Sequence, residues 1–175
     1  MTLADNARLM KTADLLLEPA PQPEVSHAPK VRWKPNVTVA ALIERDGRFL
    51  LVEEETSDGL LLNNPAGHLD PGESPIQGTI RETLEETAWH IKLTGVVGVN
   101  LYTAPSNGVT YLRTTFIGEV FEKDESRKLD TGIIEAVWLT IEELRARSDQ
   151  MRSPMTLQIV EDYLAGRRFG LDVIG

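Results

Sequence analysis

The chain has 175 residues, 41% of them hydrophobic, which is enough for one domain with a buried core and an additional segment. Its formal net charge of −9 argues against the basic surfaces that bind nucleic acids or anionic membranes. There are no cysteines, so disulfides and thiolate metal sites are excluded. We see neither a bilayer-spanning apolar run nor a secretory leader, and we therefore expect a cytoplasmic protein.

Residues 1–35 are expected to form an N-terminal extension, followed by a single domain at residues 36–175. Residues 4–17 have the apolar spacing of a short helix. The proline-rich segment EPAPQPEVSHAPK that follows should be extended. Three alternatives remain open for this extension: packing on the domain, contact with a second subunit in a homo-oligomer, or disorder.

The remaining residues predict an α+β fold. Two apolar runs around Asp46-Gly47 predict a β-hairpin, and Asn63-Asn64-Pro65 predicts a turn. Runs rich in β-branched and aromatic residues predict further strands, and two helices are expected near the end. The expected strands are 37–44, 48–54, 91–101, 111–120 and 135–139, and the two late helices are 141–147 and 153–165. Strands with interspersed helices indicate an α/β/α sandwich.

The segment GHLDPGESPIQGTIRETLEETAW, residues 67–89, predicts a further helix. Ser74 is a favourable N-cap, Pro75 suits the first helical position, and Gln77 completes a capping box. The expected apolar face consists of residues four apart: Ile76, Ile80 and Leu84. Ala88 cannot supply the left-handed glycine that often ends a helix, so we expect a less sharp end there.

Three glutamates of this helix, Glu82, Glu85 and Glu86, should crowd one face because they are three or four residues apart. Like charges at this spacing cost roughly 0.2–0.5 kcal/mol per pair. A hard divalent cation such as Mg²⁺ or Mn²⁺ would turn that cost into a gain, since it prefers oxygen ligands. The alternative is a solvated acidic face without a ligand.

The spacing of the charged residues resembles the Nudix box, G-x5-E-x7-R-E-U-x-E-E-x-G-U, in which U is a bulky apolar residue. The matching positions are Gly67, Glu73, Arg81, Glu82, Glu85 and Glu86. Three positions depart from the motif: Thr83 stands at the first apolar site, Ala88 replaces the second glycine, and Trp89 is an unusually large final residue.

Other segments are similar to the phosphatase NudJ subfamily of Nudix hydrolases: KPNVTVAALIERDGRFLLVEE, NNPAGHLDPGE and MRSPMTLQIVEDYLAGRRF. The resemblance implies the Nudix fold, an α/β/α sandwich with a mixed sheet and a catalytic strand-loop-helix box. It also implies a Mg²⁺- or Mn²⁺-dependent phosphohydrolase that acts on small phosphorylated substrates and releases phosphate. The substrates implied are nucleoside tri- and diphosphates, thiamine pyrophosphate and its hydroxymethylpyrimidine pyrophosphate precursor.

Two alternatives belong to the same fold. One is a pyrophosphatase for ADP-ribose or oxidised nucleotides. The other is a non-catalytic sensor of a phosphorylated metabolite, which the presence of every glutamate of the box disfavours.

The resemblance also assigns roles to individual residues. The implied metal ligands are Glu82, Glu85, Glu86 and the carbonyl oxygen of Ala66. Glu85 is our candidate for the base that deprotonates water, and the alternatives outside the box are Glu119, Glu122 and Glu135. Arg81 is expected to orient the glutamates with Glu73 as its partner, and Gly67 to allow a tight turn against the ligand.

A few residues outside the glutamate cluster are candidates for substrate contact, each with a purely structural alternative. His68 and Arg113 could bind phosphate. The rings of Trp89, Tyr102 and Tyr111 could stack on a base. Arg152 is expected to cap or anchor the last helix.

Overall fold

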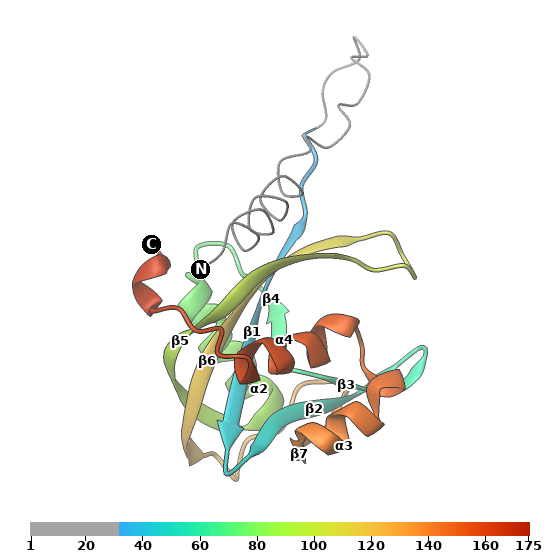
Figure 1. The fold of residues 1–175 in the computed structure, drawn as a ribbon, viewed down its shortest axis with the longest axis vertical. Coiled ribbons are helices and arrows are strands. Elements are labelled where there is room, and N and C mark those ends of the chain that lie inside the picture. Colours follow the sequence, from blue (N-terminus) through green and yellow to red (C-terminus); the bar gives the residue numbers. More distant parts are fainter. Residues whose placement is uncertain (1–31) are drawn as a thin grey trace, which may run out of the picture. The chain divides into compact units, whose positions relative to one another are not determined.

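The computed structural model describes residues 32–175 (Figure 1). Most of the expected extension, including the helix predicted at residues 4–17, lies outside the described residues. Among residues 32–175, no helix is both long and apolar enough to cross a membrane.

Seven strands form one mixed sheet in the order β3-β2-β1-β6-β5, with β4 beside β1 and β7 beside β2. The strands are β1 (Asn36–Arg45), β2 (Arg48–Thr56), β3 (Gly59–Asn63), β4 (Ala66–His68), β5 (Trp89–Thr103), β6 (Thr110–Lys123) and β7 (Ile133–Thr140). β1 and β6 run parallel, and the other pairs are antiparallel. The mixed sheet expected from the family resemblance is therefore present.

The hairpin predicted at Asp46-Gly47 joins β1 to β2. Both turn residues have positive φ, 55° and 75°, as the tight two-residue turn requires. The expected strands at 91–101 and 111–120 lie within the longer β5 and β6. The short strands β3 and β4 were not predicted, since the sequence between residues 56 and 68 indicated only a turn.

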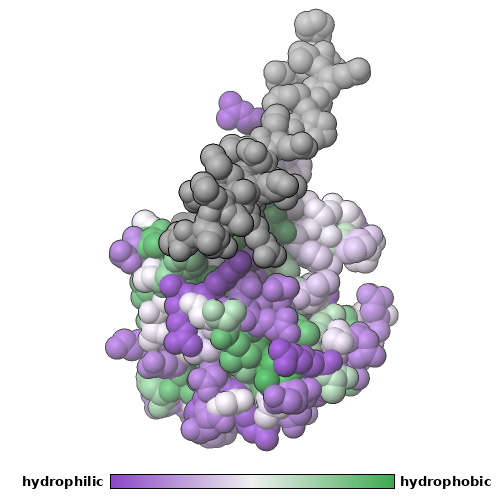
Figure 2. All heavy atoms as spheres, in the orientation of Figure 1, coloured by the Kyte–Doolittle hydropathy of each residue, from purple (hydrophilic) through white to green (hydrophobic). Residues whose placement is uncertain are grey.

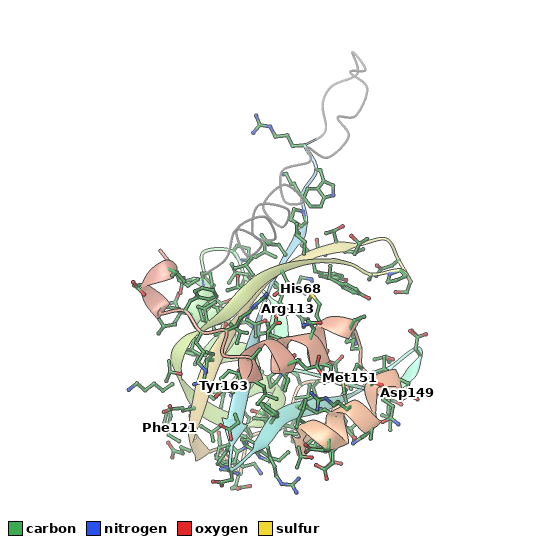
Figure 3. All side chains as sticks on the ribbon, viewed as in Figure 1. His68, Arg113, Phe121, Asp149, Met151 and Tyr163 are labelled. Atoms are coloured by element: carbon green, nitrogen blue, oxygen red, sulfur yellow. The ribbon has the colours of Figure 1, made fainter. Side chains whose placement is uncertain are left out.

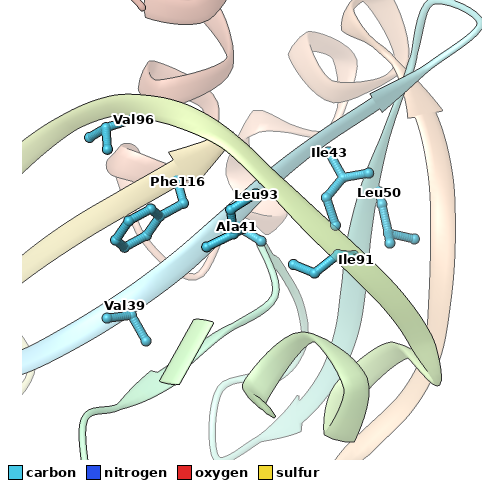
Figure 4. Packing of buried hydrophobic residues seen from close by; sticks show 8 residues of the cluster. All are labelled: Val39, Ala41, Ile43, Leu50, Ile91, Leu93, Val96 and Phe116. Atoms are coloured by element: carbon cyan, nitrogen blue, oxygen red, sulfur yellow. The ribbon is translucent and has the colours of Figure 1, made fainter. Parts of the chain in front are cut away.

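Both faces of the sheet are buried, because side chains of β1 alternate between two apolar clusters. Val39, Ala41 and Ile43 belong to the first cluster, drawn in Figure 4, while Leu42 belongs to the second. Helix α2 (Pro75–Thr87) packs against the first cluster through partly buried isoleucines. Helices α3 (Ile141–Ala146) and α4 (Pro154–Leu164) contribute buried side chains to the second. The predicted α/β/α sandwich is thus confirmed.

Two short 3-10 helices complete the fold: η1 (Ser148–Gln150) lies between α3 and α4, and η2 (Leu171–Val173) lies near the end of the chain. The last helix was predicted at 153–165 and is α4, after which Gly166 has a φ of 90°. On the face seen in Figure 2, hydrophilic residues surround a hydrophobic patch.

Helix α2 begins as predicted: Ser74 and Gln77 form the capping box, with Pro75 first in the helix. The predicted apolar face packs against the first cluster through Ile76 and Ile80, but the most buried side chains of the helix are others. Ile76, Ile80 and Leu84 are only partly buried, and the buried face carries threonines instead: Thr79, Thr83 and Thr87. Each threonine hydroxyl donates to the carbonyl oxygen four residues earlier, at 2.8, 2.7 and 2.6 Å. With its hydroxyl satisfied within the helix, a threonine can be buried like an apolar residue.

The end of α2 also corrects a prediction. Ala88 adopts the left-handed conformation, with φ 60° and ψ 12°, and its N–H donates to the carbonyl oxygen of Leu84. The helix therefore ends sharply without glycine, and β5 starts at Trp89. An alanine in this conformation costs about 1–2 kcal/mol.

Trp89 packs against the first apolar cluster, which is the structural alternative left open for it rather than stacking on a base. Its ring meets Trp138 edge to face, with the centroids 6.4 Å apart. The guanidinium of Arg45 lies 5.1 Å from the Trp89 centroid and 4.4 Å from that of Trp138. Trp89, the large residue at the end of the box, is thus part of a cation–π cluster.

Candidate active site

Arg81 organises the glutamates of α2 through five hydrogen bonds. Nε and Nη2 each donate to one carboxylate oxygen of Glu73, both at 2.9 Å. Nη1 donates to Glu82 Oε1 at 2.8 Å and to Glu85 Oε2 at 3.0 Å. Nη2 also donates to the carbonyl oxygen of His68 at 3.0 Å. The guanidinium has five N–H donors, so its hydrogen-bonding capacity is fully used to fix α2 against the loop after β4.

Glu73 is the carboxylate partner that the sequence suggested for Arg81. Its hydrogen bond from Arg81 lowers the pKa of Glu73 below the ordinary value, partly opposed by burial. The pair is bidentate, which adds geometric precision to the attraction of opposite charges. This bond fixes the start of α2 relative to the residues that carry the cluster.

Two glycines let the loop approach the carboxylates. A Cβ at Gly67 would meet the Glu82 carboxylate well inside 3.0 Å, a separation that real Cβ atoms essentially never show. A Cβ at Gly78 would lie 2.9 Å from Glu73 Oε2 and 3.0 Å from Leu69 Cδ1. Gly67 thus forms one wall of a cradle around Glu82.

Glu86 is the most buried of the cluster glutamates, with 8% of its surface exposed. Burial raises its pKa to about 8, although a hydrogen bond of 2.8 Å from the Ala66 amide opposes the shift. Repulsion from nearby carboxylates adds to the increase, and these belong to Glu54, Glu82 and Asp130. Burial is also the main cause of a raised pKa at Glu82.

This donor set fits the divalent cation that the resemblance implies. Its carboxylates are hard oxygen donors that repel one another, so a cation would stabilise them. Arg81 occupies one oxygen each of Glu82 and Glu85; the second oxygen of Glu82 is left for another ligand, while that of Glu85 lies 3.7 Å from Arg127 Nη2. In the part of the chain that the structure describes, no three acidic or histidine side chains are already gathered as a complete metal site.

A cleft of about 540 Å³ opens beside this cluster. Ala66, Gly67 and Glu86 line it on the side of α2 and β4. It also brings together four of the predicted substrate-contact residues: His68, Tyr102, Tyr111 and Arg113. Figure 3 labels His68, which comes from β4, and Arg113, which comes from β6. The rings of His68 and Tyr111 are 6.2 Å apart.

Arg113 is an unusual cleft residue because its side chain is partly buried and its Nε is shielded from solvent. Its Nη1 donates to Asn63 Oδ1 at 3.5 Å, while its Nε has no partner among the described residues. Burial lowers the pKa of Arg113, and attraction from Glu54 and Glu86 opposes that shift. A partly buried cation with so few partners favours an anionic ligand.

The structure does not place the three alternative bases in this cleft. Glu119 lies opposite Lys92 and Glu122 opposite His90 in the β5–β6 pairing. Glu135 lies in β7, opposite Glu53 of β2. None of the three lines the cleft. Within the described part of the chain, none of the three bonds to Arg81 as Glu85 does, and the identity of the base stays a prediction.

Other charged residues near the cluster were missed by the sequence analysis. Glu54, at the cleft, is 9% exposed and accepts from Asn63 Nδ2 at 3.0 Å. The amide of Asp130 donates to the carbonyl oxygen of Glu85 at 3.1 Å. Arg127 Nη2 is 3.7 Å from Glu85 Oε1. Only the charge-rich sequence KDESRKLD, which contains Arg127 and Asp130, could have drawn attention to this loop.

Arg152 takes the second of the two roles expected for it, because it anchors the start of the last helix and does not cap it. Its guanidinium pairs with Glu54 and lines the cleft, while its amide donates to the carbonyl oxygen of Leu62 at 2.9 Å. It does not cap α4, whose N-cap is Ser153. Arg152 therefore anchors the segment before α4 to β2 and β3.

Comparison with known proteins agrees with this geometry. The NUDIX domain profile matches residues 32–158. Phosphatase NudJ from Shigella boydii serotype 4 (strain Sb227) and that from Escherichia coli (strain K12) are each 32% identical over 143 residues. These cover 82% of this chain and 92% of each relative.

Solved structures show the same similarity. A NUDIX hydrolase from Nitrosomonas europaea has a TM-score of 0.79 and 51% sequence identity, covering 81% of this chain and 97% of that one. A UDP-X diphosphatase has a TM-score of 0.64 at 18% identity, covering 93% and 73% respectively, and so shares the fold alone.

Proposed function

Because this chain belongs to the NUDIX domain family and is a Nudix hydrolase, we propose that it cleaves phosphoanhydride bonds with release of phosphate. The proposed substrates are nucleoside tri- and diphosphates and thiamine-type pyrophosphates. The arrangement of Arg81 with Glu82 and Glu85, beside buried Glu86 at the edge of the cleft, carries the proposal. Similarity to relatives named phosphatase NudJ supports phosphate, rather than pyrophosphate, as the product.

Mg²⁺ or Mn²⁺ is the proposed cofactor. Its ligands would be Glu82, Glu85, Glu86 and the carbonyl oxygen of Ala66. When bound, the cation supplies positive charge that stabilises the phosphoryl oxygens during displacement. Glu82 fits this role because its carboxylate lies in the cradle of Gly67. Ala66 fits because its amide already fixes Glu86 at 2.8 Å.

Glu85 is the proposed base, which takes a proton from the attacking water. One of its oxygens is held by Arg81 at 3.0 Å, and the other lies 3.7 Å from Arg127. These two contacts orient the carboxylate, and a positioned base contributes typically 10²–10⁴-fold to rate. Arg81 is thus a positioning residue in this scheme.

The remainder of the substrate would occupy the cleft. His68 and Arg113 would contact phosphate oxygens there, and Tyr102 or Tyr111 would lie against a planar ring. The absence of cysteine and the net charge of −9 are in keeping with a cytoplasmic enzyme that acts on small molecules. Assembly into a homo-oligomer through residues 1–35 remains a prediction.

A phosphate-release assay tests the proposal. Purified protein with Mg²⁺ would be given thiamine pyrophosphate, ATP, GDP or ADP-ribose, each with and without added inorganic pyrophosphatase. We expect phosphate to appear without pyrophosphatase, and to be lost in Glu85→Gln. Signal that depends on added pyrophosphatase would instead assign the protein to the pyrophosphate-releasing members of the family.

A further inference from the structure

Three buried polar atoms on the floor of the cleft have no hydrogen-bond partner among the described residues. They are Thr38 Oγ1, Arg113 Nε and Ser153 Oγ. Thr38 and Ser153 are only 4% and 8% exposed, and all three residues line the cleft. Buried polar atoms normally have a partner, so their common location indicates a polar ligand.

The N-terminus of α4 meets the cleft at the same place. Ser153 is the N-cap of this 11-residue helix, yet its hydroxyl makes no bond to the helix backbone. Helix N-termini attract anions because their N–H groups and dipole present positive charge. The Ser153 hydroxyl is therefore free to donate to an anion at this position.

Of the two arginines that line the cleft, Arg152 has a carboxylate partner and Arg113 has none among the described residues. Glu54 is already paired with Arg152 and also accepts from Asn63. The other oxygen-bearing group nearby, Asn63 Oδ1, is shared between Thr156 Oγ1 at 3.2 Å and Arg113 Nη1 at 3.5 Å. The remaining donors of Arg113 are available to a ligand.

The pairing of β1 with β6 and with β4 places Thr38, Arg113 and His68 side by side. Thr38 of β1 is the direct partner of Arg113 of β6 in the parallel register. Thr38 is also the partner of His68 of β4, two residues after Ala66. The unpaired donors therefore lie next to the carboxylate cluster, within the same cleft.

We propose that Thr38, Arg113 and Ser153, together with the N-terminus of α4, form a phosphate subsite that binds the substrate's terminal phosphate, which is attached through a single anhydride bond. This inference rests on the proposed function in that the anhydride bond of this phosphate would lie at Glu82, Glu85 and Glu86. A terminal phosphate carries more negative charge than a phosphate substituted on both sides, as both phosphates of ADP-ribose are. The subsite thus selects nucleoside di- or triphosphates and thiamine-type pyrophosphates over ADP-ribose.

Titration calorimetry with inorganic phosphate tests the subsite without any turnover. The full chain would be titrated in EDTA at constant ionic strength, as wild type, Thr38→Val, Ser153→Ala and the matched control Ser148→Ala. Ser148 is exposed and lies outside the cleft. We expect phosphate to bind wild type and Ser148→Ala equally. Loss of one hydroxyl that donates to the anion should weaken binding roughly tenfold or more.

Thermal unfolding of the same variants separates binding from folding. The Thr38 and Ser153 hydroxyls have no partner in the described residues, so replacing either should leave the midpoint unchanged or raise it. A purely structural hydroxyl would instead lower the midpoint without affecting phosphate binding. Lower stability with unaltered phosphate affinity would therefore overturn the proposal.

A kinetic comparison then addresses selectivity. With Mg²⁺, Ser153→Ala should lower kcat/KM for GDP or thiamine pyrophosphate by roughly tenfold, and leave that for ADP-ribose within about threefold. Equal losses on both substrate types would contradict a terminal-phosphate subsite. If no substrate were turned over, the proposed function would fail, but the phosphate titration would still decide the subsite. Absent binding to wild type, or equal binding to all variants, would overturn it.

Discussion

Replacing Gly67 with alanine should damage catalysis far more than folding. The added Cβ would meet the Glu82 carboxylate well inside 3.0 Å. Since carbon contacts are optimal near 3.5–4.0 Å, the carboxylate must move by on the order of 1 Å. A misplacement of that size at a reacting centre costs ~10²-fold in rate. The expected loss of stability from overpacking is about 1–3 kcal/mol.

The matched control is Gly98→Ala, also in the sheet. A Cβ there would meet only Asn100 Oδ1 at 3.7 Å, which is ordinary contact. We would measure kcat/KM with saturating Mg²⁺ and, in parallel, urea unfolding for wild type and both variants. We expect Gly98→Ala to keep kcat/KM within about threefold of wild type. A folded Gly67→Ala protein with wild-type kcat/KM would refute the argument that the loop and Glu82 form one cradle.

Three further predictions concern α2. Arg81→Lys should lower kcat/KM at least tenfold and destabilise the protein by about 1–3 kcal/mol, because lysine cannot form the bidentate bond to Glu73. Activity assays and urea unfolding measure the two effects. Adding Glu73→Gln to Arg81→Lys should cause little further loss of either activity or stability. In EDTA, the free energy of unfolding should fall as pH rises from about 5 to 8, by up to about 1.4 kcal/mol per unit. The reason is that burial raises the pKa of Glu86 from 4.5 to about 8, so the folded state retains a proton that the unfolded chain has lost; Glu86→Gln should flatten this dependence, and an unchanged slope would contradict it. Ala88→Gly should raise the unfolding free energy by about 0.5–1 kcal/mol, because glycine adopts a φ of 60° without strain; calorimetry that found it destabilised would contradict this.

Local features of the fold could be predicted from the sequence because short-range chemistry decides them. The Asp46-Gly47 turn and the Ser74–Gln77 capping box depend on residues within three positions of each other. The Arg81–Glu85 bond likewise follows from helical spacing. What the sequence did not indicate within α2 is the burial of threonines that bond back to the helix, since the predicted isoleucines do pack against the core.

The rest of the candidate site depends on contacts between distant residues. Arg152 meets Glu54 across 98 positions, and Thr156 meets Asn63 across 93. The local sequence around each partner does not indicate such a pair. The position of Glu119 also depends on the folded chain: the sequence left it as a candidate base, but it does not line the cleft.

Diffraction from crystals grown with Mn²⁺ tests the central claim most directly, because the anomalous signal locates the cation without reference to activity. The account predicts a peak within about 2.0–2.3 Å of carboxylate oxygens of Glu82, Glu85 and Glu86 and of the Ala66 carbonyl oxygen. Crystals of Glu82→Gln serve as the control and should show a weaker peak or none. A strong peak elsewhere, or one that persists unchanged in the variant, would contradict the assignment of these residues as the metal site.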